Sequence, residues 1–177
     1  MAYPAAVLPT YGLKLEALLV QPIESSNMRV SPLILFSPVI TLAAPSAERI
    51  TQLFAPLATG DGNSLVDLFS PNITWTTIGG VVGGARNYTE TLEFFASVNN
   101  AIDGTYKVET VSVISEGAEG KHSSTELKAA DGTVGTNGVR YDQRYVWVSE
   151  WDGEKMVSNR EYLDSALADR LFGANSV

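Results

Sequence analysis

Hydrophobic residues recur at helical spacing in three segments of the first half of the chain. In the first, which reads SAERITQLFAPLATGD, Ile50, Leu53 and Leu57 fall on one stripe behind Ser46, a residue type that caps helices. A second short helix is predicted over NSLVDLFSP and a third over YTETLEFFASVNNAI. Between these two lie NITWTTI, which is typical of a strand, and GGVVGGARN, which we interpret as a flexible glycine-rich loop.

The pattern changes to alternation in the second half of the chain. Four segments are typical of strands: TYKVETVSVIS, HSSTELKAA, VRYDQRYVWVSEW and KMVSNREYL. Asp-Gly turns precede or separate these strands, and DSALADRLF is predicted to close the chain as a helix. Helices followed by an antiparallel meander predict an α+β fold with the helices on one face of the sheet.

The composition of the chain excludes several kinds of partner and chemistry. The chain has 177 residues, 45% of them hydrophobic, which is enough to bury a sizeable core in one domain. A net charge of −8 argues against nucleic acids and anionic membranes as partners, because both attract basic faces. The absence of cysteine excludes disulfides and thiolate chemistry, and a single histidine argues against zinc, so we expect neither metal nor cofactor.

The first 44 residues show no clear period, and we interpret residues 1–44 as an appendage to a domain over residues 45–177. From Met28 the chain reads MRVSPLILFSPVITLAAPSAE, one basic residue followed by an apolar run and small residues, as in a secretory signal. If the true start is Met28, residues 28–44 are a signal peptide and the protein is secreted. If residues 28–44 form an ordinary buried strand instead, a cytoplasmic location is favoured, and the 27 preceding residues support this alternative. The apolar run is too short to span a bilayer.

The order of these elements resembles the nuclear-transport-factor-2-like (NTF2-like) superfamily, in particular its SnoaL-like branch of polyketide cyclases and isomerases of fungal type. The resemblance covers roughly residues 46–172 and rests on FAPLATGD, ITWTTIGG, YDQRYVWV and GEKMVSNREYLD in that order. It implies a cone-shaped, curved antiparallel sheet wrapped around N-terminal helices, with a deep apolar pocket. Members include isomerases, cyclases, dehydratases and non-catalytic binding domains, so the fold does not settle the activity.

Glu161 is the first candidate for a catalytic residue. SnoaL-like cyclases carry an acidic residue on the last strand, six positions after the lysine that begins it, and Lys155 gives Glu161 that place. A carboxylate in an apolar cone loses hydration, so its pKa rises and it becomes a better general base near neutral pH. The alternative is a surface glutamate that pairs with Arg160 or Arg144.

Strand alternation selects the residues that would bind a substrate. In YDQRYVWV one face is aromatic and the other is charged, and we expect the aromatic face to line the pocket. Gln143 is an uncharged amide on that face, and a ligand oxygen could be its partner. Asn159 shares a face with Glu161 and Val157, although a bulge would change such assignments locally. The predicted substrate-binding residues are Trp75, Phe94, Tyr141, Gln143, Trp147 and Asn159.

His122 is the second candidate for a catalytic residue, because histidine titrates near neutral pH without a shift of its pKa. It could pair with Glu161 or donate to a substrate oxygen. The alternative is a solvated residue at the mouth of a hairpin, since Gly120 and Lys121 precede it.

These residues predict a cofactor-free isomerase, cyclase or dehydratase that acts by general acid/base catalysis on a hydrophobic, polyketide- or terpenoid-like small molecule. Glu161 would be the base, with His122 and Gln143 orienting oxygen atoms of the substrate. The alternative is a non-catalytic small-molecule-binding module of the same fold. We expect no nucleic-acid or membrane partner, and we consider a homodimer among the assemblies.

Overall fold

A computed structural model describes residues 42–173 of the chain, so most of the predicted appendage and its signal-like segment lie outside the described residues. At the start of the described part, the backbone N–H of Leu42 donates to the Asp152 carboxylate at 2.9 Å. The backbone N–H of Ala44 donates to the carbonyl oxygen of Gly120 at 2.8 Å, and Ala44 is buried. The domain boundary between residues 44 and 45 remains a prediction.

Polar caps set the starts of the main helices. The helical segments of the described chain are α1 (Ala47–Phe54), η1 (Ala55–Thr59), α2 (Asn63–Val66), α3 (Tyr88–Ala101), η2 (Gly117–Glu119) and α4 (Ser165–Phe172). Side-chain oxygens of Ser46, Asn87 and Asp164 each accept a hydrogen bond from a backbone N–H three residues further on, at the starts of α1, α3 and α4. No helix among residues 42–173 has the length and apolar character needed to cross a membrane.

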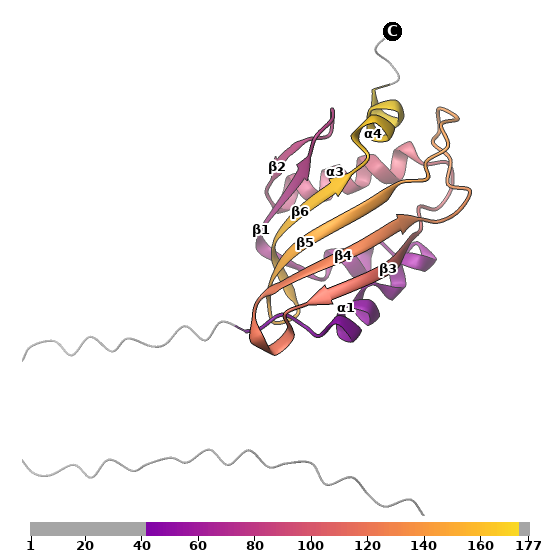
Figure 1. The fold of residues 1–177 in the computed structure, drawn as a ribbon. Coiled ribbons are helices and arrows are strands. Elements are labelled where there is room, and N and C mark those ends of the chain that lie inside the picture. The colour runs from indigo at the N-terminus through magenta and orange to yellow at the C-terminus, as the bar shows by residue number, and fades with distance from the viewer. Residues whose placement is uncertain (1–41, 174–177) are drawn as a thin grey trace, which may run out of the picture. The chain divides into compact units, whose positions relative to one another are not determined.

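The domain contains one six-stranded sheet, which packs against the helices (Figure 1). Its strands are β1 (Phe69–Ile78), β2 (Gly84–Arg86), β3 (Val108–Ser115), β4 (His122–Ala129), β5 (Arg144–Asp152) and β6 (Lys155–Leu163). They are arranged in the order β2-β1-β6-β5-β4-β3. The predicted α+β class and the antiparallel meander from β3 to β6 are confirmed.

The pairing of β1 with β6 differs from the antiparallel sheet that the sequence predicts. These two strands run parallel, whereas the neighbouring pairs are antiparallel. A long connection through α3 and four further strands separates β1 from β6, so no hairpin forces them to run in opposite directions. The last strand thereby lies in the middle of the sheet, flanked on both sides by strands that can supply hydrogen-bond donors.

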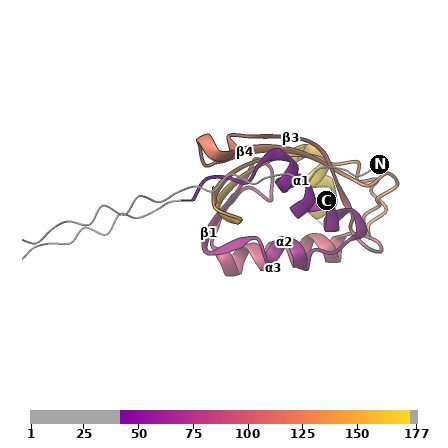
Figure 2. The ribbon, with the colours of Figure 1, turned by 90° about the horizontal axis from the view of Figure 1, so that it is seen from below.

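The helices α1, α2 and α3 lie on one side of the curved sheet, and Figure 2 shows α2 and α3 as a layer opposite the strands. The core between them is rich in aromatic side chains, with Phe54 of α1 packed edge-on against Trp147. The register of β5 and β6 shifts between Glu150 and Trp151, and Met156 is buried while Val157 is only half-buried. Strand alternation predicts Val157 on the inner face together with Glu161. The bulge changes the orientation of Val157, whereas Glu161 still points inward.

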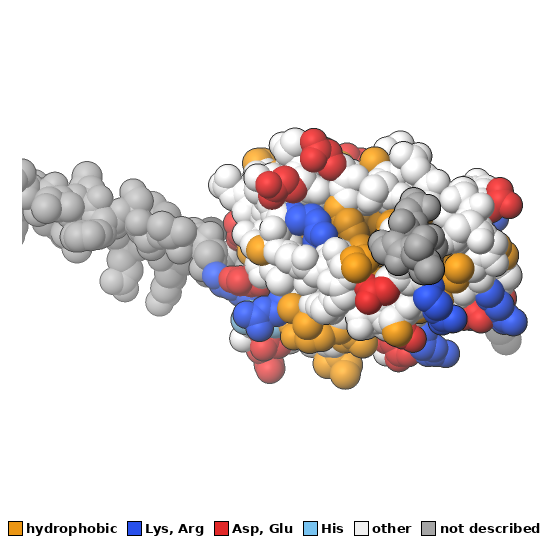
Figure 3. Space-filling view, turned by 90° about the horizontal axis from the view of Figure 1, so that it is seen from above, with side chains coloured by type: hydrophobic (Ala, Val, Ile, Leu, Met, Phe, Trp, Pro, Cys, Tyr) orange, Lys and Arg blue, Asp and Glu red, His pale blue; other side chains and the backbone are white. Residues whose placement is uncertain are grey.

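Hydrophobic side chains also reach the surface of the domain. On the outer face of the sheet the exposed ones include Ile78, Ile114, Val146, Val148 and Tyr162. The face seen from above combines hydrophobic side chains near its middle with basic and acidic ones around them (Figure 3). The exposed apolar side chains on the outer face of the sheet suit contact with another protein chain. The homodimer stays a prediction.

Candidate active site

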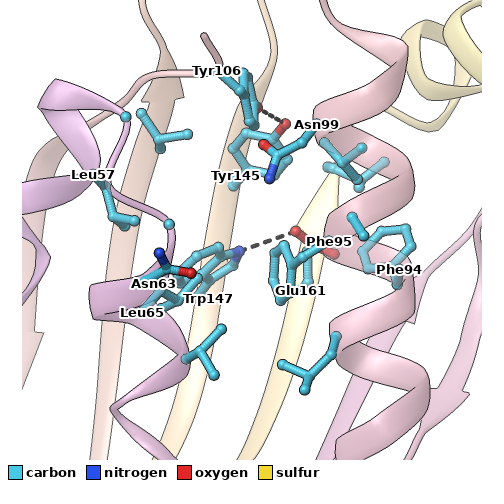
Figure 4. A pocket seen from close by; sticks show the side chains of 18 of the residues that line it. Leu57, Asn63, Leu65, Phe94, Phe95, Asn99, Tyr106, Tyr145, Trp147 and Glu161 are labelled. Carbon is cyan, nitrogen blue, oxygen red and sulfur yellow. Dashed lines mark hydrogen bonds between the residues drawn. The ribbon is translucent and has the colours of Figure 1, made fainter.

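A cavity of about 520 Å³ opens among α2, α3 and the inner face of the sheet. Most of its wall is apolar, with contributions from Leu57, Leu65, Val82, Leu92, Phe95 and Leu163. Figure 4 shows side chains from the helices and strands pointing into this space. Its volume lies within the range of pockets that enclose small organic molecules.

Glu161 extends from β6 into the cavity, and its side chain is buried, with the residue only 3% exposed. The register places it between Thr77 of β1 and Trp147 of β5. Its Oε2 accepts hydrogen bonds from Trp75 Nε1 at 3.2 Å and from Thr77 Oγ1 at 2.9 Å. Its Oε1 accepts one from Trp147 Nε1 at 3.2 Å, drawn in Figure 4. The alternative of a surface glutamate is therefore excluded.

Two opposing effects set the proton affinity of the Glu161 carboxyl. Burial raises its pKa above the ordinary value, because the charged form loses hydration. The hydrogen bonds from Thr77, Trp75 and Trp147, together with the positive charge of Arg86, act in the opposite direction. Indole N–H groups can only donate, so both tryptophans hold the carboxylate in an orientation that suits its ionised form.

Three tyrosines form a second polar group in the cavity wall. The hydroxyls of Tyr106 and Tyr145 share a hydrogen bond, and Tyr145 donates to the Tyr141 hydroxyl at 3.3 Å. Burial raises the pKa of all three phenols, so they remain protonated at neutral pH. A protonated hydroxyl cluster can donate a hydrogen bond to an oxygen atom of a bound molecule. Figure 4 shows the Tyr106–Tyr145 pair and Glu161 as separate parts of the same pocket.

The predicted aromatic residues take two different positions. Phe94, Tyr141 and Trp147 lie in the cavity wall. Trp75 is fully buried beside the cavity, where its ring packs edge-on against Trp147 at 4.9 Å between ring centroids. Its indole N–H is bonded to Glu161, so Trp75 supports the carboxylate rather than lining the pocket.

Gln143 is buried, as an inner-face residue should be, but its partners are backbone groups. Its Nε2 donates to the carbonyl oxygen of Asp164 at 3.0 Å, and its Oε1 accepts from the N–H groups of Asp164 and Arg144, both at 3.1 Å. The side chain therefore ties the start of β5 to the cap of α4. These bonds replace the ligand oxygen that we expected as its partner.

Asn159 is also buried on the inner face, outside the wall of the cavity. Its Oδ1 accepts a hydrogen bond from Ser149 Oγ at 2.7 Å, across the β5–β6 pair. Asn159 comes two residues before Glu161 on β6, and its side chain lies in the core rather than at the pocket.

The structure does not bring His122 to Glu161. The inward residues at this end of β4 are Ser123 and Thr125, which puts His122 on the outer, solvent-exposed face. Its Nδ1 lies 3.1 Å from the Glu116 carboxylate, in a hairpin contact exposed to water. The reading of His122 as a solvated residue at a hairpin mouth fits this position.

Sequence reasoning missed three residues of the site. Tyr106 lies in the coil before β3, where no periodic pattern indicates its direction. Thr77 and Arg86 fall in segments that the sequence predicts as a strand and a loop. The alternation of Ile73, Trp75 and Thr77 along that strand is a signal that identifies Thr77 as an inner residue. Within residues 42–173 no group of three or more potential ligands could hold a metal ion.

Comparisons with known proteins agree with this fold. No protein-family model matches the chain, and no curated protein matches its sequence. Solved structures do match: PrhC from Penicillium brasilianum has a TM-score of 0.59 at 12% identity, over 70% of this chain and 83% of its own. An NTF2-like protein of unknown function from Burkholderia pseudomallei has a TM-score of 0.57 at 17% identity, over 70% of this chain and 94% of its own.

A third match is a Bacillus subtilis protein whose assignment as an isomerase is provisional. Its TM-score is 0.57 at 17% identity, over 71% of this chain and 91% of its own. The chain therefore has the NTF2-like fold. Sequence identities this low show the fold alone, and the activity has to be argued from the site.

Proposed function

We propose that the protein is an isomerase-type enzyme that moves a proton on an uncharged, hydrophobic molecule containing a carbonyl group. We also propose that it belongs to the SnoaL-like branch and works without a cofactor. The observation that carries the proposal is a buried carboxylate, Glu161, that faces the same apolar cavity as a protonated tyrosine cluster. A base and a hydrogen-bond donor in one chamber are the two groups that enolisation of a ketone requires.

In this mechanism Glu161 removes a proton from the carbon next to the carbonyl group. The electron pair of the broken C–H bond moves onto the carbonyl oxygen, and the enolate oxygen accepts a hydrogen bond from the tyrosine cluster. Glu161 then returns the proton to a different carbon, which completes an isomerisation. Aldol-type cyclisation and elimination of water can begin with the same proton abstraction, so these reactions remain within the proposal.

The charges of the cavity favour a neutral substrate. Glu161 and Asp61 are the charged residues of its described wall, which contains no lysine, arginine or histidine. A carboxylated or phosphorylated molecule would face these carboxylates without a counter-ion. The apolar wall and the volume favour a compact, polyketide- or terpenoid-like skeleton instead. Isomerase assignment of a structural neighbour raises the plausibility of the reaction class only by analogy of fold.

Non-catalytic binding is the second candidate function. One observation favours it: Trp75, Trp147 and Thr77 already bond Glu161, so the carboxylate could serve to orient a ligand hydroxyl without removing a proton. In that case apolar ligands would bind tightly and leave unchanged.

Replacement of Glu161 by Gln separates the two functions, because it keeps the shape and removes the base. The probe is a panel of bicyclic β,γ-unsaturated ketones, with solvent deuterium entering the carbon next to the carbonyl as the readout by NMR. We expect the wild type to catalyse this exchange and Glu161→Gln to lose roughly 10²-fold or more, with ligand affinity little changed. Glu154→Gln, which removes an exposed carboxylate, is the matched control.

Full exchange activity in Glu161→Gln would rule out this residue as the base. Tight binding of the ketones by the wild type, with no exchange above the rate in buffer, would replace the enzyme by the binding module.

A further inference from the structure

Arg86 of β2 reaches two parts of the site through one guanidinium group. Its Nη1 donates to Thr77 Oγ1 at 3.1 Å, and its Nη2 donates to the carbonyl oxygen of Val82. Nη1 also lies 3.3 Å from the carbonyl oxygen of Gly84, and the guanidinium carbon is 4.1 Å from the centre of the Phe94 ring. A planar fork that is stacked on a ring and bonded on two sides has little freedom to move.

The Thr77 hydroxyl passes the influence of Arg86 to Glu161. Thr77 is buried, and its oxygen accepts from Arg86 while its single proton is donated to Glu161 Oε2 at 2.9 Å. A guanidinium group cannot accept a hydrogen bond, so the bond from Arg86 forces the hydroxyl proton toward the carboxylate. The donor to Glu161 is thus oriented by a charged group that does not itself touch the carboxylate.

The same guanidinium group holds part of the cavity wall. Val82 is buried and lines the cavity, and it belongs to the glycine-rich loop at residues 79–84. A second anchor of this loop is the Asp169 carboxylate of α4, which accepts from the N–H of Val81 at 2.7 Å. Gly80 has a φ of 67°, and a Cβ there would come within 2.6 Å of Asp169 Oδ1, so the loop fits closely against α4.

We infer that Arg86 is a positioning residue: through Thr77 it orients and stabilises the ionised Glu161 carboxylate, and through Val82 it links that carboxylate to the glycine-rich loop that contributes to the cavity wall. The inference rests on the proposed role of Glu161 as a base. The inference gives a role to Arg86, which belongs to the segment GGVVGGARN that the sequence predicts only as a flexible loop.

The electrostatic attraction between Arg86 and Glu161 supports this role of Arg86. Burial raises the pKa of Glu161, and attraction to Arg86 opposes that rise; burial lowers the pKa of Arg86, and attraction to Glu161 opposes that change. The other titratable groups here are Asp61 in the cavity wall, Glu90 of α3, which also attracts Arg86, and the three tyrosines, whose burial keeps them neutral. Arg86 is therefore the cationic group that acts on Glu161 among the described residues.

The test reads the ionisation of Glu161 without any substrate. Because the indoles of Trp75 and Trp147 are bonded to its carboxylate, we expect the tryptophan fluorescence of the full chain to change as Glu161 titrates. In Glu161→Gln this transition should disappear. In Arg86→Met and in Thr77→Val the midpoint should move to higher pH by about one unit, the lower end of the effect of a nearby opposite charge. Arg86→Lys keeps the charge and should fall between Arg86→Met and the wild type.

Arg160→Met is the matched control, because Arg160 precedes Glu161 on β6 but is exposed on the outer face. Its midpoint should equal that of the wild type. If the fluorescence midpoint is unchanged in folded Thr77→Val and Arg86→Lys, the inference is overturned. These two variants are milder than Arg86→Met, so the test can still be made if Arg86→Met does not fold. A shift in Arg160→Met equal to that in Arg86→Met would also overturn it, because a general charge effect would then suffice.

The outcome is independent of the proposed reaction. If Glu161→Gln retains full exchange activity but the midpoints shift as expected, the link from Arg86 to Glu161 stands and the proposed function fails. If Glu161→Gln is inactive and the midpoints do not shift, Glu161 remains the base and Arg86 loses its role. Where exchange is measurable, the low-pH limb of kcat/KM in Arg86→Met should move in the same direction as the fluorescence midpoint.

Discussion

Replacement of Gln143 by Leu should destabilise the domain. Gln143 is fully buried and makes three hydrogen bonds, to both backbone groups of Asp164 and to the N–H of Arg144. Leucine has a similar length and no polar atom, so it removes all three bonds. Asp164 caps α4, and Leu167 and Leu171 of that helix pack close to Tyr141, so the loss should also loosen this end of the site.

The expected magnitude follows from the groups left without partners. A buried backbone group that loses its partner costs about 1–3 kcal/mol, and these groups are only partly shielded from water, so values near the lower end apply. Three such groups, less the gain of burying an apolar side chain, give a loss of about 2–4 kcal/mol in the free energy of unfolding. Such a loss is a large fraction of the stability of an ordinary domain.

Equilibrium unfolding in urea measures this change, with Gln52→Leu as the matched control. Gln52 is exposed on α1, so its replacement should change stability by no more than about 0.5 kcal/mol. If Gln143 instead bonded a ligand, Gln143→Leu would weaken ligand binding and leave the unfolding midpoint in place. A midpoint equal to that of the wild type would thus refute the structural role assigned to Gln143.

Two further predictions concern the Glu161 carboxyl group and the volume of the cavity. Since burial raises the pKa of Glu161, the folded protein binds its proton more readily than the unfolded chain, and stability relative to Glu161→Gln should fall as pH rises from the ordinary glutamate value through the raised one. Urea unfolding of both proteins over this pH range tests it, and a constant difference would contradict it. Leu92→Trp should fill part of the cavity and weaken binding of an apolar fluorescent probe by about tenfold or more, with the helix still formed. Unchanged affinity would place the probe at another site.

Local patterns predicted most of the fold because they arise from short-range physics. Ser46 caps α1 since its side chain meets the Arg49 N–H three residues on, and this spacing is visible in the sequence. The inward direction of Glu161 follows from the period of two along a strand. The parallel pairing of β1 with β6 depends on contacts between residues far apart in the chain, and no local signal reports them.

The candidate site was predictable only where its residues lie on regular strands. Tyr106 joins the tyrosine cluster from a coil, and Arg86 reaches Thr77 from a three-residue strand, so neither follows from periodicity. Gln143 was placed correctly on the inner side, but its partner Asp164 is distant in sequence. The direction of a side chain can be inferred from alternation; the group that it meets there cannot.

The surroundings of Glu161 bear on the choice between catalysis and binding. The donors of Trp75, Trp147 and Thr77 favour the ionised carboxylate, while burial favours the neutral one, and burial has the larger effect. A group that takes up a proton and returns it must be able to exist in both forms during one cycle. A site that only holds a ligand needs a single form, and a carboxylate stabilised in that form would not need to be buried at a cost in stability. The opposing effects at Glu161 therefore meet this requirement of the proton transfer proposed above.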